Sequence, residues 1–125
     1  MARLDKDSRH AISKALQTRV PPHWRVVVGA DGCAFIELDQ DGRKPPNQFP
    51  STGSTVLRVT NAGDGSVVVE RFRRVPCPPG YVEAREPIGI VCVVSGRKWR
   101  EEVVEAMVSS VLDADAVMSG IMGEA

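Results

Sequence analysis

The sequence predicts an α+β domain, in which a mostly antiparallel sheet of about five strands carries an N-terminal and a C-terminal helix on one face. In the stretch 55–74, TVLRVTNAGDGSVVVERFRR, two β-rich runs flank Asn, Asp and Gly residues that favour a turn, which predicts a hairpin. Apolar residues recur at helical spacing within 6–19 and again from residue 97 onward. A length of 125 residues with 42% hydrophobic side chains suits a single domain spanning 1–125.

The first predicted helix covers about residues 6–19. Asp5, Asp7 and Ser8 are available as N-terminal caps, and a Pro-Pro pair at 21–22 ends the pattern. The apolar positions that define the buried face are Leu4, Ala11, Ile12, Ala15, Leu16 and Val20.

A second hairpin is predicted directly after this helix. Residues 24–29 and 34–38 read as strands, and Ala-Asp-Gly at 30–32 forms the turn between them. The two-residue period of a strand places Trp24 and Val26 on one face, together with Val28.

Residues 39–54, DQDGRKPPNQFPSTGS, form a long proline-rich loop. Loops longer than about 12 to 15 residues are uncommon in compact domains and tend to be functional or disordered. Two interpretations stay open: an arm that projects onto a partner through Phe49, with Arg43 and Lys44 of the same loop as further contacts, or a surface loop with Phe49 packed back onto the core.

The run IGIVCVV at 88–94 is continuously apolar, which predicts a strand that is buried on both faces and central in the sheet. The proline-containing stretch 75–87 before it is predicted to be irregular. The final helix follows Ser95 and Gly96. Its apolar stripe consists of Trp99, Val103, Met107 and Val111, widened by Val104, Val108 and Leu112.

A short additional segment is predicted at 113–125, with Asp113 and Asp115 as caps. Its apolar residues include Met118 and Met122. Because methionine packs adaptably, this end of the chain either fills the core or is offered to a neighbouring subunit.

The charges balance in number but are unevenly distributed. The chain has 16 basic and 16 acidic residues, and residues 101–125 hold acids and no base. Residues 1–100 therefore carry a formal charge of +6 and residues 101–125 a charge of −6. Two explanations stay open: an acidic helix folded against its own basic body, or head-to-tail contact between copies of the chain.

Compartment and solubility follow from what the sequence lacks. No stretch approaches the roughly 20 apolar residues of a membrane span, and the first residues resemble no secretion signal. The three cysteines, Cys33, Cys77 and Cys92, are odd in number and widely spaced. We therefore expect a soluble protein of the cytoplasm, with reduced thiols.

Searches for metal and catalytic motifs give no match. Glu37, Asp39 and Asp41 have the spacing of the first calcium-loop ligands, but Gln48 stands where a bidentate Glu is needed. The two histidines and three cysteines lack zinc-site spacing. No nucleophile elbow, phosphate loop or dinucleotide fingerprint is present. We expect no catalytic residues, no metal, no cofactor and no enzymatic activity.

Two basic clusters are the remaining candidates for partner binding. One ends the central hairpin and the other begins the last helix, where the helix dipole disfavours cations. They consist of Arg71, Arg73 and Arg74, and of Arg97, Lys98 and Arg100. Pairing of Arg97 with Glu101, and of Lys98 with Glu102, would offset that cost. Three interpretations of these clusters stay open. They bind nucleic acid, they bind an acidic surface of another protein, or they only pair with neighbouring acids of the same chain.

The predicted layout resembles the small tail-terminator and head-to-tail connector proteins of tailed bacteriophages. The strand 88–94 followed by the helix from Arg97 is the most similar part, and the loop 39–54 is compatible with their projecting loop. The resemblance is architectural and assigns no individual residue. It implies a non-enzymatic subunit that assembles with other protein subunits, as a homo-oligomeric ring at the end of a tail tube, and therefore a location in a virion as the alternative to the cytoplasm.

Two alternatives to an assembly subunit stay open. The first is a monomeric binding module, such as an inhibitor or immunity-type protein, that presses a loop or an acidic face onto one target. The second, less favoured because aromatic residues for stacking are scarce and the net charge is zero, is a nucleic-acid binder that uses the arginine clusters.

Overall fold

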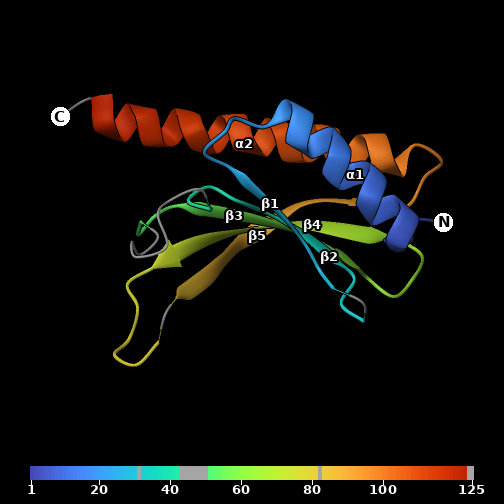
Figure 1. The fold of residues 1–125 in the computed structure, drawn as a ribbon, viewed down its shortest axis with the longest axis horizontal. Coiled ribbons are helices and arrows are strands. Elements are labelled where there is room, and N and C mark those ends of the chain that lie inside the picture. Colours follow the sequence, from blue (N-terminus) through green and yellow to red (C-terminus); the bar gives the residue numbers. More distant parts are fainter. Residues whose placement is uncertain (31, 43–50, 82, 124–125) are drawn as a thin grey trace.

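A computed structural model describes residues 1–30, 32–42, 51–81 and 83–123 of the chain (Figure 1). The elements in order are α1 (Lys6–Arg19), β1 (Arg25–Val28), β2 (Phe35–Asp39), β3 (Thr55–Asn61), β4 (Val67–Val75), β5 (Ala84–Val94) and α2 (Trp99–Gly123). The five strands form one sheet in the order of the sequence, and every neighbouring pair is antiparallel. Both helices lie on the same face of the sheet (Figure 1), so the predicted α+β fold is confirmed.

Helix α1 spans the predicted residues 6–19. The Asp5 side chain caps it by accepting a hydrogen bond of 2.8 Å from the Ser8 backbone N–H, and this bond lowers the pKa of the Asp5 carboxyl. The hydroxyl of Ser8 itself accepts a bond of 3.0 Å from the Arg100 side chain of α2. The start of α1 is thus joined to the start of α2.

Both predicted hairpins are present. In the turn between β3 and β4, Gly63 and Gly65 have φ angles of +87° and +86°, a conformation that L side chains rarely adopt. The register of β2 with β3 pairs Ile36 with Val59 and Leu38 with Leu57, so that apolar side chains lie side by side on the helix-facing side of the sheet.

The core lies between this face and the two helices. The sheet contributes one side chain in two, as the alternation of a strand requires, and each helix contributes one stripe. The most deeply buried members are Leu4, Ile12, Leu16, Trp24, Ile36, Leu38, Leu57, Val59, Val67, Val69, Val103, Met107, Val111 and Ala114. The predicted helix stripe is therefore correct, except that Leu112 is 60% exposed.

The prediction that residues 88–94 form a central strand is wrong. Strand β5 is the last of the sheet and lies at its edge, and Ile88, Ile90 and Val93 are 49%, 63% and 56% exposed. A continuous apolar run indicates a preference for burial, but the order of the strands decides whether a neighbour is available to provide it. The strand also begins at Ala84, within the stretch predicted to be irregular, because residues 84–87 pair with the end of β4.

The prediction of a separate segment at 113–125 is also wrong. Helix α2 continues without a break from Trp99 to Gly123 and includes both Asp113 and Asp115. Val111 before Asp113 and Ala114 after it are each 1% exposed, so the buried stripe of the helix runs past Asp113 at helical spacing. Burial of this stripe stabilises a continuous helix rather than a new helix that begins at Asp113.

Replacement of Leu38 by Ala should destabilise the fold by about 2–5 kcal/mol, because the side chain is fully buried between sheet and helices and its loss leaves a cavity. Urea unfolding of the purified protein measures this change. Leu112→Ala on the outer side of α2 is the matched control and should change the unfolding free energy by less than about 0.5 kcal/mol. Equal losses in the two variants would contradict the assigned core.

Candidate protein interface

The exposed edge of the sheet is the feature that stands out on the surface. Ile88, Ile90, Val91 and Val93 of β5 are all exposed, although large apolar side chains are normally buried. No charged residue occurs between Pro87 and Gly96. Natural edge strands are commonly protected by charged side chains against pairing with other chains. That protection is missing along this apolar part of β5.

The backbone of β5 is paired on one side only. Strand β4 occupies that side, and among the described residues no strand occupies the other. The pairing with β4 is irregular at two places, between Val69 and Glu70 and between Arg71 and Phe72. Pro87, which has no N–H to donate, lies next to the second irregularity. Bulges and proline limit how regular a ladder the free edge can offer.

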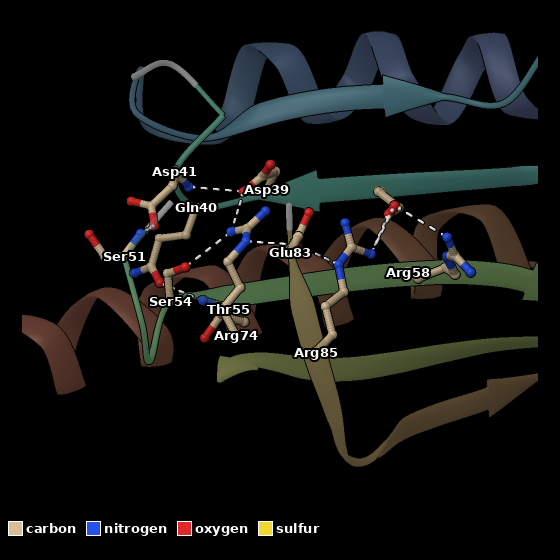
Figure 2. A network of polar contacts seen from close by, with 11 residues as sticks. Asp39, Gln40, Asp41, Ser51, Ser54, Thr55, Arg58, Arg74, Glu83 and Arg85 are labelled. Atoms are coloured by element: carbon tan, nitrogen blue, oxygen red, sulfur yellow. Dashed lines mark hydrogen bonds and ion pairs between the residues drawn. The ribbon is translucent and has the colours of Figure 1, made fainter. Parts of the chain in front are cut away.

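A chain of ion pairs holds the first half of β5 to the rest of the sheet (Figure 2). Arg74 of β4 bridges Asp39 of β2 and Glu83 just before β5, at 2.8 Å in both cases. Glu83 also contacts Arg85 of β5 at 2.7 Å.

The chain continues from Arg85 to Glu37 of β2 at 3.0 Å, and from Glu37 to Arg58 of β3 at 3.4 Å. Glu37 alternates along β2 with the core residues Ile36 and Leu38, which places it on the face opposite the helices. Acids and bases alternate along the whole chain of pairs, so its six residues together carry no net formal charge.

Burial and the neighbouring carboxylates together set the pKa values of the two central arginines, Arg74 and Arg85. The Arg74 side chain is 4% exposed, and it also donates to the Ser54 hydroxyl at 3.0 Å. Burial by itself lowers the pKa of Arg74, but its hydrogen bonds and the charges of Asp39 and Glu83 outweigh this effect and raise it. The same balance, with Glu83 and Glu37 as partners, raises the pKa of Arg85. Both guanidinium groups therefore stay charged, and the chain of ion pairs serves to position β5.

Asp115 fixes the second half of α2 over the start of the sheet. Its carboxylate accepts hydrogen bonds from Trp24 Nε1 at 3.1 Å and from Gln40 Nε2 at 3.1 Å, and it lies 2.9 Å from His23 Nε2. The Gln40 side chain in turn accepts a bond of 2.8 Å from the Thr55 backbone N–H. Asp115 thus has a tertiary role that its sequence context did not reveal.

The basic cluster at the end of β4 does not form one surface. Successive residues of a strand alternate between its faces, so Arg74 points away from Arg73. Arg74 is buried in the chain of ion pairs, Arg73 pairs with Glu86, and Arg71 lies 3.5 Å from the Thr55 hydroxyl.

The cluster at the start of α2 is more accessible. Arg97 and Lys98 are exposed, and among the described residues neither forms the expected ion pair with Glu101 or Glu102. Arg100 lies over the Trp99 ring, 5.6 Å from its centroid.

The remaining predicted contact residues are not placed. Arg43, Lys44 and Phe49 lie outside the described residues, as do the side chains of Met118 and Met122. The exposed apolar edge of β5 was not among the contact residues predicted from the sequence, although the uncharged stretch 87–96 was a signal for it.

The described residues contain no group of three or more His, Cys, Asp or Glu side chains that could hold a metal ion. A hollow of about 340 Å³ lies beside the ion-pair chain, lined in part by Thr52, Cys77 and Tyr81. Burial and the nearby Glu102 raise the pKa of the Cys92 thiol, which disfavours its reactive thiolate form.

Comparisons of the chain with protein-family models, with curated proteins and with solved structures gave no match. Across the residues that the structure describes, neither helix is long and apolar enough to pass through a membrane.

Removal of Arg74 should weaken the whole sheet. Arg74→Met keeps most of the side-chain volume but leaves Asp39 without its ion-pair partner and Glu83 with Arg85 alone, and we expect a loss of at least about 2 kcal/mol in unfolding free energy. The control is Arg73→Met, whose pair with Glu86 is solvent-exposed and contributes less than about 1 kcal/mol. Urea unfolding measures the free energy of unfolding of both variants. A similar decrease in Arg74→Met and Arg73→Met would rule out a special structural role for Arg74.

Proposed function

We propose that the protein is a non-enzymatic subunit of a protein assembly and binds other protein subunits, chiefly copies of itself. The observation that carries this proposal is the apolar edge strand β5, with Ile88, Ile90, Val91 and Val93 exposed to solvent. Contiguous apolar patches on a small domain mark interaction sites, because their exposure to water is unfavourable by about 25 cal/mol for each Å².

The charges of α2 support the same proposal. Arg19 of α1 pairs with Glu105, and His23 contacts Asp115, so part of the acidic helix is used within the chain. Three further acids on its surface, Glu101, Glu102 and Asp113, form no ion pair among the described residues. They are available to the basic surface of a neighbouring copy, as are Arg97 and Lys98 to an acidic one.

The specific form of the proposal is a ring-forming tail-terminator or neck-type subunit of a tailed phage. What supports it is the arrangement alone: a helix at each end of the chain, one antiparallel sheet, and a late strand that leads directly into the last helix. In such a subunit, function means geometry, and the surface contacts matter more than any reactive side chain.

A monomeric binding module is the second candidate, and the same edge favours it. A free strand can accept an extended segment of a foreign target by β-augmentation, without any self-assembly. Nucleic-acid binding has less support, because Arg73 and Arg74 are already neutralised by Glu86, Asp39 and Glu83.

The mass of the protein in solution tests the proposal. Light scattering after size exclusion should give a species heavier than the 13.5 kDa chain, whose fraction rises with protein concentration. Repetition at high salt separates the two kinds of contact, since charge pairing weakens with salt while apolar burial does not. A constant mass of one chain at all concentrations would contradict self-assembly and favour the binding module.

A further inference from the structure

We infer that two copies of the chain pair through their β5 edges, antiparallel and related by a two-fold axis at Val91, so that one continuous sheet runs through both. This inference rests on the proposed assembly function and specifies its first contact. The surface involved is the segment 88–94 of each copy.

Strand pairing fits the free groups of this edge. Along its outer side, β5 presents backbone N–H and C=O groups that no other strand among the described residues takes up. A second strand supplies partners for these groups and at the same time covers the apolar side chains beside them. Packing of an unrelated flat surface would cover the side chains but leave the backbone groups unpaired.

A second copy is the partner that the sequence of the edge favours. A two-fold contact places each residue opposite its own counterpart or a near neighbour, so the segment must be complementary to itself. Residues 88–94 consist of Ile, Val, Cys and Gly and carry no charge, which means that no like charges meet across the axis. The seven-residue segment overlaps itself fully when the axis passes through its middle residue, Val91.

The charges at the two ends of the segment favour the antiparallel direction. Glu86 precedes it, half exposed and already paired with Arg73, whereas Arg97 and Lys98 follow it and have no ion pair among the described residues. An antiparallel pair keeps the two basic ends apart, because each then lies beside the start of the other copy's β5, where Arg85 and Glu86 are both in ion pairs. A parallel pair would place the two basic ends side by side.

The opposite edge of the sheet is a poorer partner. Strand β1 has four residues against eleven in β5, and it begins with the exposed charge of Arg25. Head-to-tail pairing of β5 with β1 would therefore cover only part of the apolar segment. Val28 is 42% exposed at the end of β1, so a charged substitution at this residue tests the head-to-tail alternative.

The irregular pairing of β4 with β5 sets the strength of the contact. Val91 and Ile88 are the β5 residues that have no partner on β4, and Pro87 has no N–H to donate, so the ladder at the free edge is irregular. The new interface therefore depends largely on side-chain burial at Ile88, Ile90 and Val93. Such a contact is reversible, and it leaves the folded single chain as the unit that assembles.

The inference is tested by charged substitutions in the full chain. Ile90→Lys and Val93→Lys each place two ammonium groups in the apolar contact, and we expect the dissociation constant to rise about 100-fold or more. Val28→Lys and Leu112→Lys are matched controls at other exposed apolar positions and should leave it unchanged. Sedimentation gives the constants, and thermal melting verifies that every variant is folded.

The outcomes separate the inference from the proposed function. An oligomer that forms equally well with Ile90→Lys and Val93→Lys overturns the β5 contact and leaves an assembly subunit that uses another surface. Dissociation by Val28→Lys as well overturns the two-fold arrangement in favour of head-to-tail pairing with β1. A wild-type chain that stays single at every concentration overturns both.

A disulfide across the axis tests the register. In a chain with Cys33→Ser, Cys77→Ser and Cys92→Ala, we expect Val91→Cys to form a covalent dimer on mild oxidation. Opposite Cα atoms of an antiparallel pair are about 4.5–5.5 Å apart, within the range that a disulfide spans. Leu112→Cys in the same background is the control, and cross-linking no faster than this control would contradict an axis at Val91.

Discussion

The packing of α1 and α2 against the same face of the sheet is the constraint on which the rest of the structure depends. Both helices bury their apolar stripes against Ile36, Leu38, Leu57 and Val59, and this takes up one side chain in two along the inner strands. No helix covers the opposite face in the described part of the chain. Residues that alternate with the core must therefore satisfy one another or meet a partner.

Along the first half of β5, the charged side chains satisfy one another. Arg74, at 4% exposure, would be costly to bury alone, but Asp39 and Glu83 lie on either side of it. Desolvation disfavours the charged form of Arg74, but its hydrogen bonds and the charges of the two carboxylates outweigh this effect. The buried guanidinium therefore stays charged. The match is not complete, since Arg58 Nε is buried without a hydrogen-bond partner.

Along the second half of β5, no such compensation exists within the chain. Ile88, Ile90 and Val93 remain in solvent, and the neighbouring backbone has a free side. The ion pairs that anchor Glu83 and Arg85 hold this strand in place, so its apolar end is presented on a well-positioned element rather than on a loose one. Positioning of this kind limits the conformational entropy that a partner has to remove on binding. This combination supports the proposed role in assembly.

The sequence by itself determined the local elements. Helical spacing and the caps around Asp5 predicted α1 within its observed limits, and turn residues such as Gly63 and Gly65 predicted the central hairpin. These patterns suffice because each reports a backbone preference or a period that acts over a few residues. The alternation in the first hairpin also placed Trp24 and Val26 on one face, which is the face that packs against the helices.

Only the tertiary structure decided which preferences were met. The apolar run at 88–94 predicted a buried strand, but it lies in the last strand of the meander, and among the described residues no strand pairs with its outer side. Asp115 was expected to cap a helix, yet it accepts hydrogen bonds from Trp24 and Gln40, far away in the sequence. Arg74 belonged to a basic cluster in the sequence and to a neutral chain of ion pairs in the fold. Such outcomes depend on which residues, distant in the sequence, lie next to a side chain in the fold. The local spacing of residues does not contain this information.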